Sequence, residues 1–380
     1  MLLKNAKIFN EEFELVKQNI TINGEKIAAI DETACADEVL DLAGYTVLPG
    51  LIDMHIHGCA GRDTGEATPD ALEAMSQCLV RRGVTSFCPT SMTLSAEELG
   101  KIFANVAACK QTVGGAYIHG VNMEGPYIAM SKKGAQNGAY VRNPDKEEVL
   151  RLYNDCGGVN KEVDIAPECE GAEEFVKEVE PICPVSIAHT AAGYDEACAA
   201  IEWGVRHVTH LYNAQSGLTH RSPGVVGAVF DKTREYGVRA ELICDGFHIH
   251  PAALRIAFAQ LGEDNSVIIS DSMCAAGHVD GEYDLGGQTV YVKDGKALLA
   301  DGTIAASTSN VYEELKNVIS FGIPLKQAVK SATINPARAI RVDNETGSIA
   351  VGKNADLLVV DDDFNIVLVI VKGCIKVDNR

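Results

Sequence analysis

Short apolar runs alternate with helix-like segments from about residue 49 to residue 340. Strand-like runs lie at 86–90, 117–123, 185–189, 208–210 and 267–271. Helix-like segments between and around these runs lie at 69–82, 95–110, 145–155, 172–180, 195–203 and 251–261. A strand followed by a helix, repeated over this length, indicates a parallel α/β architecture. The size of the region fits a (β/α)8 TIM-type barrel.

The two ends of the chain have a different pattern. Residues 2–9, 18–22 and 26–30 read as short strands, and Asn23-Gly24 between two such runs is a hairpin signal. Residues 355–360 and 366–371 also read as strands, interrupted by three aspartates at 361–363. We therefore expect a small β-sandwich domain made from residues 1–48 plus 341–380, with the barrel at 49–340 inserted between them.

Two histidines follow the first apolar run of the barrel region. His55 and His57 are one residue apart in Asp-Met-His-Ile-His-Gly, and side chains on a strand alternate, so both point to the same side. Two imidazoles on one face form half of a metal site. A His-x-His pair alone is a weak signal, because many such histidines are structural.

Further ligand types follow other apolar runs. Glu124, His189, His210 and Asp271 each lie at or just past such a run. Active sites of barrels lie at the carboxyl ends of their strands, so these side chains are expected to converge. A lone histidine at a strand end is more often structural, and Asp271 alone would fit a helix cap. Their recurrence on several strands favours a metal-dependent hydrolase.

Composition narrows the range of partners. The 380 residues are 46% hydrophobic and 23% charged, which is ordinary for a globular protein, and the formal net charge is -20. Such a charge repels nucleic-acid phosphates and anionic membranes, so neither is an expected partner. An anionic substrate would need a local positive site.

The cysteines and the first residues bear on the compartment. Twelve cysteines are scattered singly, without a Cys-x-x-Cys pair, which disfavours a disulfide framework and a thiolate zinc site. The first ten residues contain no long apolar stretch of a signal peptide, and no segment approaches a membrane span. We expect reduced cysteines and a cytoplasmic location.

Several longer strings are more specific than His-x-His. They are Pro-Gly-Leu-Ile-Asp-Met-His-Ile-His-Gly at 49–58, Met-Glu-Gly-Pro-Tyr-Ile at 123–128, His-Leu-Tyr-Asn-Ala at 210–214, Asp-Gly-Phe-His at 245–248, Asp-Ser-Met at 271–273 and Asn-Pro-Ala-Arg-Ala-Ile at 335–340. In this order the chain resembles the N-acetylglucosamine-6-phosphate deacetylase family of the amidohydrolase superfamily. The resemblance implies a homodimer of metal-bearing barrels, each with a small β-sandwich.

The resemblance also implies a metal site. Glu124, His189 and His210 match the ligands of the principal metal. His55 and His57 match the ligands of a second metal in the family branch that keeps His-x-His, with Glu124 bridging. The implied cofactor is a divalent metal, Zn²⁺ or Fe²⁺, with one or two ions per chain. Asp271 matches the catalytic carboxylate.

Substrate contacts follow from the same resemblance. Asn213, the Ala214 backbone, His248 and Arg221 match positions that bind the sugar phosphate, with Arg221 reaching across the dimer interface. Gln136 stands where some members carry a histidine beside the substrate carbonyl. Glutamine can donate a hydrogen bond but carries no charge, so carbonyl polarisation would rest more on the metal. Ala306 stands where glycine is usual, in a segment expected to form a flap over the substrate.

The implied reaction is hydrolysis of the N-acetyl group of N-acetylglucosamine 6-phosphate in amino sugar catabolism. A second enzymatic hypothesis is an amidohydrolase for a related N-acyl amino sugar phosphate, an N-acyl amino acid or a cyclic amide. A third is a non-catalytic metal-binding barrel, which loss of Asp271 or of the ligands would have indicated. The remaining histidines are expected to be structural, as are Cys59 and Cys274; these histidines are His119, His207, His220, His250 and His278.

Overall fold

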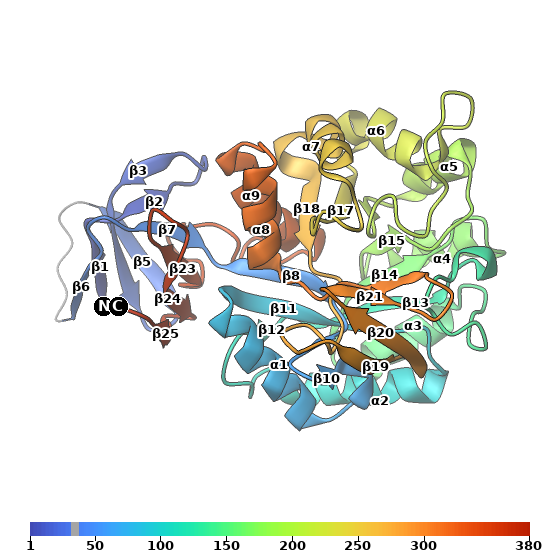
Figure 1. Cartoon of the computed structure of the whole chain (residues 1–380), viewed down its shortest axis with the longest axis horizontal. Helices are drawn as coiled ribbons and strands as arrows, with labels where there is room; N and C mark the ends of the chain where they lie inside the picture. The colour runs from blue at the N-terminus through green and yellow to red at the C-terminus, as the bar shows by residue number, and fades with distance from the viewer. Residues whose placement is uncertain (32–37) are drawn as a thin grey trace.

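The computed structural model describes residues 1–31 and 38–380 and has two parts (Figure 1). A small all-β part contains both chain ends, and a larger part holds parallel strands surrounded by helices. Among the described residues, no helix is long and apolar enough to cross a membrane.

The small part is a sandwich of two sheets. One has the strand order β5-β4-β1-β6, and the other has the order β25-β24-β23-β7-β2-β3. Their bounds are β1 Leu2–Lys4, β2 Lys7–Phe9, β3 Leu15–Lys17, β4 Asn19–Asn23, β5 Lys26–Asp31, β6 Val39–Asp41, β7 Thr46–Pro49, β23 Leu357–Val360, β24 Ile366–Val371 and β25 Cys374–Asp378. Aliphatic side chains from both ends of the sequence, among them Leu3, Ile20, Val359 and Leu368, form its core. The expected β-sandwich built from both ends is confirmed.

Two local features differ from the sequence expectation or refine it. The run at 2–9 is two strands, β1 and β2, because the chain turns at Asn5, whose φ is 65°. Each half therefore joins a different sheet. The expected hairpin joins β4 to β5, with Asn23 paired to Lys26.

The larger part is a barrel of eight parallel strands. The order β8-β11-β13-β14-β15-β16-β17-β18 is continuous, and the short β12 (Tyr117–Ile118) pairs beside β11. Their bounds are β8 Leu51–Ile56, β11 Val84–Ser91, β13 Val121–Tyr127, β14 Asn160–Ile165, β15 Val185–Ile187, β16 His207–Val208, β17 Arg239–Ile243 and β18 Ser266–Ile269. The end of β18 returns to β8, where Asp271 N donates to His55 O at 2.9 Å and Ile56 bridges to Ser272. The predicted TIM-type barrel is confirmed.

Helices follow the barrel strands. The six expected ones are present as α1 Pro69–Arg81, α2 Ala96–Cys109, α3 Lys146–Asp155, α4 Ala172–Val179, α5 Tyr194–Trp203 and α7 Pro251–Asn265. Polar caps fix several of their starts: the Ser95 hydroxyl and the Glu98 carboxylate form a capping box at α2, and Asp145 caps α3. Four further helices were not predicted: α6 Gly224–Tyr236, α8 Val311–Ser320, α9 Leu325–Ala332 and α10 Ile334–Ala339.

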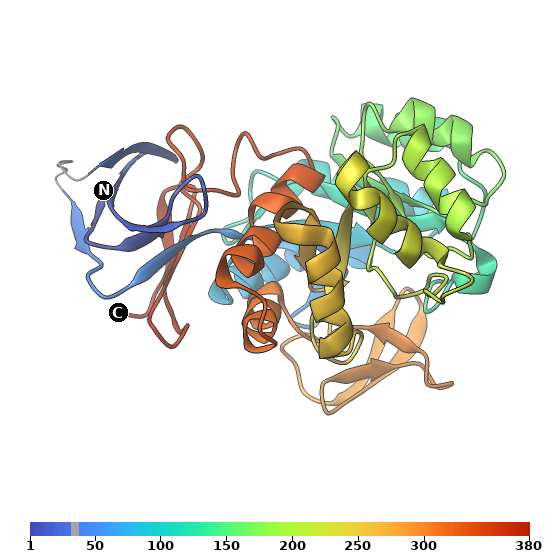
Figure 2. The same cartoon turned by 90° about the horizontal axis from the view of Figure 1, so that it is seen from above.

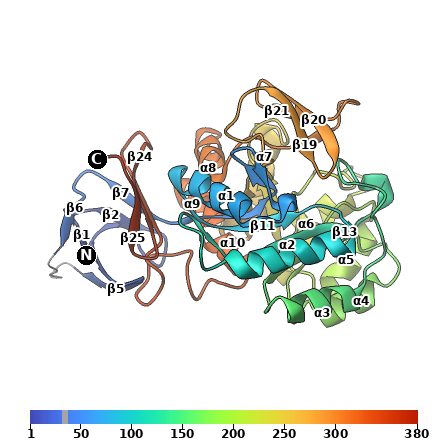
Figure 3. The same cartoon turned by 90° about the horizontal axis from the view of Figure 1, so that it is seen from below.

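A separate four-stranded sheet projects from the barrel and is formed by the chain between β18 and α8. Its antiparallel strands are β19 Gly281–Leu285, β20 Gln288–Lys293, β21 Lys296–Leu298 and β22 Ile304–Ala306. Figures 2 and 3 show it standing apart from the sandwich, on another side of the barrel. Ala306, in the segment expected to form a flap, is the last residue of β22 and is buried.

The connection between sandwich and barrel is short. β7 of the sandwich leads directly into β8 of the barrel through Gly50, where a Cβ atom would collide with the side chain of Thr85. Gly50 N also donates to Asp356 O at 2.8 Å. We propose that the division between the two domains falls here and near residue 340, giving 1–48 plus 341–380 and 49–340. The strand that carries His55 and continues to His57, β8, is therefore fixed at its start by the contacts of Gly50.

Candidate active site

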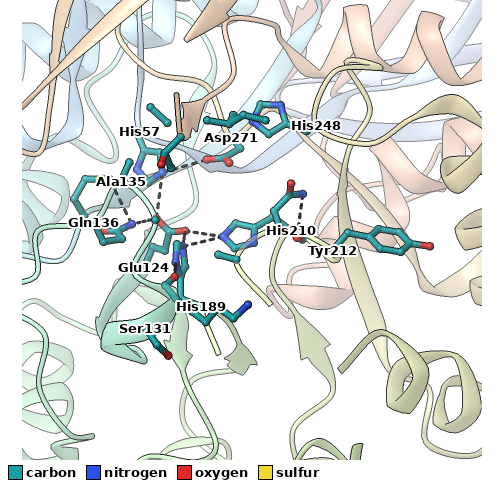
Figure 4. A pocket seen from close by; sticks show the side chains of 18 residues that line it. His57, Glu124, Ser131, Ala135, Gln136, His189, His210, Tyr212, His248 and Asp271 are labelled. Carbon is teal, nitrogen blue, oxygen red and sulfur yellow. Dashed lines mark hydrogen bonds and ion pairs between the residues drawn. The ribbon is translucent and has the colours of Figure 1, made fainter. Parts of the chain in front are cut away.

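The ligand-type residues predicted from the sequence meet at the carboxyl ends of the barrel strands. Figure 4 shows all of them except His55. Each of them is less than a tenth exposed. They lie in, or one or two residues past the end of, five strands: His55 and His57 at β8, Glu124 at β13, His189 at β15, His210 at β16 and Asp271 at β18. The strand-end positions read from the sequence are thus neighbours in space.

Glu124, His189 and His210 form a compact group. Glu124 Oε1 lies 3.1 Å from His189 Nε2 and 3.0 Å from His210 Nε2, and the two nitrogens are 3.1 Å apart. Lone pairs of three such atoms repel one another unless a positive charge lies among them. The arrangement therefore suits a metal ion held by two imidazoles and a carboxylate.

His55, His57 and Asp271 form a second group beside the first. Asp271 Oδ1 lies 3.5 Å from His55 Nε2 and 3.3 Å from His57 Nε2. Glu124 belongs to both groups, because its Oε2 lies 3.3 Å from His57 Nε2 while its Oε1 faces His189 and His210. A carboxylate with one oxygen toward each group has the geometry of a bridging ligand.

Hydrogen bonds set which ring nitrogen faces the centre. His189 Nδ1 donates to Lys132 O at 2.8 Å, and His57 Nδ1 lies 3.3 Å from Thr90 O. A carbonyl oxygen can only accept, so each Nδ1 carries the proton and each Nε2 is left as a metal ligand. His55 Nε2 is buried without a hydrogen-bond partner. Such an orphaned nitrogen, aimed at two carboxylates, fits a bound cation.

The pKa values follow from the same contacts. Burial alone would raise the pKa of Glu124, but hydrogen bonds from His189 and His210 outweigh it and hold the pKa well below its usual range. Burial opposes protonation of His57, yet Asp271 and Glu124 raise its pKa to about 10. The site thus attracts positive charge, which a proton supplies when no metal is bound and a metal ion supplies otherwise.

Three of these residues have an unusual backbone conformation. The φ angles of His189, His210 and Asp271 are 43°, 30° and 47°, in the left-handed region that residues other than glycine seldom adopt. Each lies two residues past the end of a barrel strand, where the chain turns over the end of the barrel. Strained backbone of this kind concentrates at functional sites.

A third group of ligand-type residues was not predicted. Glu162, His207 and Glu241 lie close together and are buried among the barrel strands. His207 Nε2 lies 3.6 Å from Glu162 Oε2 and 3.4 Å from Glu241 Oε1. Glu241 also contacts His55, so the sequence reasoning missed a carboxylate that supports a candidate ligand.

A cavity of about 400 Å³ opens beside the two groups. Gln136 lines it but also points back into the site: its Nε2 donates to Glu124 Oε2 at 2.5 Å, and its Oε1 accepts from Thr93 N at 2.6 Å. Asn213, Ala214 and His248 line the cavity as well. Residues 303–305 at the start of β22 complete the lining, so part of the expected flap segment borders the site.

His248 is held by a neighbouring carboxylate. Its Nδ1 donates to Asp245 Oδ2 at 2.6 Å, and Asp245 Oδ1 accepts from the backbone N–H groups of Phe247 and His248, both at 2.8 Å. This turn fixes the orientation of the imidazole. Lys132 also lines the cavity, and among the described residues no other lysine does. The sequence analysis did not single it out.

Other residues lie elsewhere. Arg221 is exposed and does not line the cavity of its own chain. His119 is buried beside Ser86 and Tyr117, away from the ligand groups. The eleven cysteines in the described residues are free thiols, and Cys59 and Cys274 are among the buried ones. Cys35 lies outside the described residues.

The fold and the site together define a barrel hydrolase of the metal-dependent class. Residues 46–376 match the amidohydrolase family. The chain belongs to that family.

Similar proteins cover almost the whole chain. N-acetylglucosamine-6-phosphate deacetylase of Bacillus subtilis is 34% identical, with 98% of this chain and 96% of that protein covered. N-acetylgalactosamine-6-phosphate deacetylase of Escherichia coli O157:H7 is 31% identical, with 98% of each covered. A solved mutant of the Mycobacterium smegmatis N-acetyl-D-glucosamine-6-phosphate deacetylase, in complex with N-acetyl-D-glucosamine-6-phosphate, has a TM-score of 0.91. It is 30% identical, with 99% of this chain and 98% of that chain covered.

Proposed function

We propose that this protein hydrolyses the N-acetyl group of N-acetylglucosamine 6-phosphate, giving glucosamine 6-phosphate and acetate. The observation that carries the proposal is Glu124, whose two oxygens face two groups of ligands beside a cavity that Asp271 also lines. The similarity to a B. subtilis deacetylase over 98% of the chain supports the same substrate class. The cavity of about 400 Å³ is in the range of small-molecule sites.

The proposed cofactor is a divalent metal, Zn²⁺ or Fe²⁺, with two ions per chain. Glu124, His189 and His210 would hold one ion, and His55 and His57 the other, with Glu124 shared. A metal ion bound there would lower the pKa of a bound water toward about 7 and polarise the acetyl carbonyl. Imidazole and carboxylate ligands suit either metal.

Asp271 is the proposed proton carrier. Burial would raise its pKa, but the hydrogen bond from His57 and the nearby His55 lower it, so the carboxylate is ionised and can accept a proton. Asp271 takes a proton from the attacking water, whose oxygen forms a bond to the carbonyl carbon. As the C–N bond breaks, Asp271 gives that proton to the departing amine.

Polar groups around the cavity are proposed to bind the sugar phosphate. Asn213, the Ala214 backbone and His248 line the cavity, and Gln136 lies beside Glu124. Because Arg221 is exposed and outside its own cavity, it would serve the neighbouring site of a homodimer. Arginine suits phosphate because its planar fork can bind two oxygens.

A second candidate substrate is the galactosamine epimer. The E. coli relative that is 31% identical acts on N-acetylgalactosamine-6-phosphate according to its name, and this chain covers 98% of it. An amidohydrolase for cyclic amides is less favoured, because the resemblance includes a phosphate-binding arginine and histidine. We also propose a cytoplasmic location, consistent with the free thiols among the described residues.

Acetate release tests these assignments. Metal-loaded protein is incubated with N-acetylglucosamine 6-phosphate, its galactosamine epimer and unphosphorylated N-acetylglucosamine. We expect the highest kcat/KM for the first. Faster release from the epimer would reassign the sugar, and no release from any of them, with metal bound, would reject the deacetylase assignment.

A further inference from the structure

A second, smaller cavity lies at the opposite end of the barrel, where strands β15, β16 and β17 begin. Its volume is about 150 Å³. Four arginines line it, namely Arg206, Arg239, Arg338 and Arg341, in a chain with 33 basic and 53 acidic residues. None of its lining residues lines the cavity beside the candidate metal site. Positive charge is therefore concentrated at a place that the proposed reaction does not use.

Two of the four arginines have carboxylate partners. Arg338 Nη1 lies 2.9 Å from Asp264 Oδ1, and Arg341 Nη2 lies 2.5 Å from Glu180 Oε1. Glu180 also lines the cavity, and its carboxylate accepts from Val185 N at 2.5 Å. These two acids offset the charge of two guanidinium groups.

The other two arginines lack an ion pair within the part of the chain that the structure describes. Arg206 donates through Nη1 to the carbonyls of Ile201 and Val205, at 2.6 and 2.8 Å, and its guanidinium stacks 5.3 Å from the Tyr236 ring centroid. These contacts orient the group without neutralising it. Arg239 Nε is buried and has no hydrogen-bond partner.

The positive charge of Arg239 is only partly offset by nearby acidic residues. Its pKa is lowered by burial and by the nearby Arg338, against the weaker opposing influence of Asp343 and Asp264. A buried donor without a partner is costly, as is a guanidinium beside another guanidinium. An anion in the cavity would offset the charge of the adjacent guanidinium groups.

We propose that this cavity binds a phosphate dianion, either as inorganic phosphate or as the terminal phosphate of a metabolite. At ~30 Å³ per water in the liquid, the cavity of about 150 Å³ has room for about five waters, comparable to the five heavy atoms of phosphate. The guanidinium groups of Arg206 and Arg239 line the cavity, and guanidinium N–H groups are donors suited to phosphate oxygens. The proposal does not depend on the deacetylase assignment.

Equilibrium dialysis with radiolabelled inorganic phosphate at low ionic strength tests it. We compare the wild-type chain with Arg239→Gln and Arg206→Gln, and use Arg151→Gln as a control. Arg151 is an exposed residue of α3 that does not line the cavity, so this variant has the same charge change elsewhere. We expect Arg239→Gln and Arg206→Gln each to weaken binding of one phosphate per chain by about tenfold or more, and Arg151→Gln to leave it unchanged.

Two further measurements keep the result decisive. Circular dichroism checks the fold, and Arg239→Lys keeps the charge but loses the fork, so its affinity should lie between those of wild type and Arg239→Gln. A crystal soaked in tungstate, which is located by its anomalous scattering, should show the oxyanion between Arg206 and Arg239. Equal phosphate binding by folded Arg239→Gln and wild type, or tungstate found only beside the candidate metal site, would overturn the proposal.

Competition identifies the source of the phosphate. Glycerol 3-phosphate is added to the dialysis at equal concentration. If glycerol 3-phosphate displaces the radiolabel as effectively as unlabelled phosphate does, the site binds phosphate monoesters. If only inorganic phosphate displaces it, the site binds the free ion. Displacement by chloride at the same concentration would show a general halide site and reject phosphate selectivity.

Discussion

Glu241 Oε2 lies 3.0 Å from His55 Nδ1, on the opposite side of the imidazole from the Nε2 that faces Glu124 and Asp271. The same oxygen accepts from His210 N at 3.1 Å. One buried carboxylate therefore holds a ring of one ligand group and the backbone of the other. Burial would raise the pKa of Glu241, but His55 and His207 lower it, so the carboxylate is ionised.

Glu241→Gln should weaken the metal bound by His55 and His57 by about 10–100-fold, as loss of such outer carboxylates typically does. The amide can still accept from His55 Nδ1, but it lacks the negative charge that strengthens the ligand. The ion held by Glu124, His189 and His210 should remain. Metal titration followed by elemental analysis measures both sites. Glu162→Gln, which changes a buried carboxylate outside the contact with His55, is the matched control.

The shared position of Glu124 predicts a different outcome. Because its oxygens face both ligand groups, Glu124→Gln should remove metal from both and abolish activity. His189→Ala or His210→Ala should also remove metal and activity together. The double change His55→Ala, His57→Ala should instead lower the metal content toward one ion per chain. Elemental analysis of gently purified protein gives the counts. Two ions retained in Glu124→Gln with normal turnover would contradict the ligand assignment.

Asp271→Asn should keep the fold and at least one metal ion but reduce kcat by about 10²–10⁴-fold, the usual contribution of a general acid–base group. Asparagine preserves the shape but cannot accept and return the proton. Steady-state kinetics with elemental analysis of the same sample separates loss of the proton carrier from loss of metal. More than about a tenth of the wild-type rate would mean that another group moves the proton.

The barrel and the main ligand candidates were predictable because they depend on local patterns. His55 and His57 alternate on one strand, and polar residues such as Glu124 occur where an apolar run ends. Strand ends of a parallel barrel converge by topology. Once the barrel is inferred, these side chains must therefore be neighbours.

The supporting residues were not predictable in this way. Glu241 lies in the middle of β17, in Arg-Ala-Glu-Leu-Ile, where a charged residue reads as one facing solvent. Only closure of the barrel shows that it points inward to His55 and that His207 lies beside it. Helix α6 was missed because its Val-Val-Gly-Ala-Val-Phe run lacks polar spacing, and β19–β22 because an antiparallel insertion interrupts the strand–helix pattern.

Arg221→Ala should raise KM for the phosphorylated sugar far more than for the unphosphorylated one, with metal content unchanged. The acidic chain needs a local positive group for an anionic substrate. Lys132→Ala is the comparison, because Lys132 lines the cavity of its own chain. Steady-state kinetics on both sugars gives the ratio. An equal change for both sugars would mean that Arg221 does not bind phosphate.

Mixed dimers test whether Arg221 acts in the partner's site. Chains carrying Arg221→Ala are mixed with chains carrying Asp271→Asn, and subunit exchange is verified by native mass spectrometry. If Arg221 acts across the interface, one site of each hybrid has both groups intact, and activity should be partly restored. Activity equal to the sum of the two separate variants would assign Arg221 to its own chain.

His119 makes stability depend on pH. It is buried, and its Nε2 lies 3.0 Å from the Ser86 hydroxyl. Burial, reinforced by Lys161, Lys110 and Lys372, lowers its pKa from the usual 6.5 to about 3. Between these pH values the unfolded chain binds a proton at His119 and the folded chain does not. The contribution is therefore fully present above about pH 6.5 and is lost as the pH falls toward 3.

At pH 5, protonation of His119 in the unfolded chain should lower the free energy of unfolding by about 2 kcal/mol relative to neutral pH. His119→Gln should remove this part of the slope of the free energy of unfolding against pH, because glutamine does not titrate. Urea unfolding between pH 5 and 8 measures how the free energy of unfolding changes with pH. Poorer packing in the variant would lower that free energy equally at every pH, so it would leave the change with pH unaltered. His220→Gln, which changes an exposed histidine, should keep the wild-type slope. An unchanged slope in His119→Gln would mean that other groups cause the acid sensitivity.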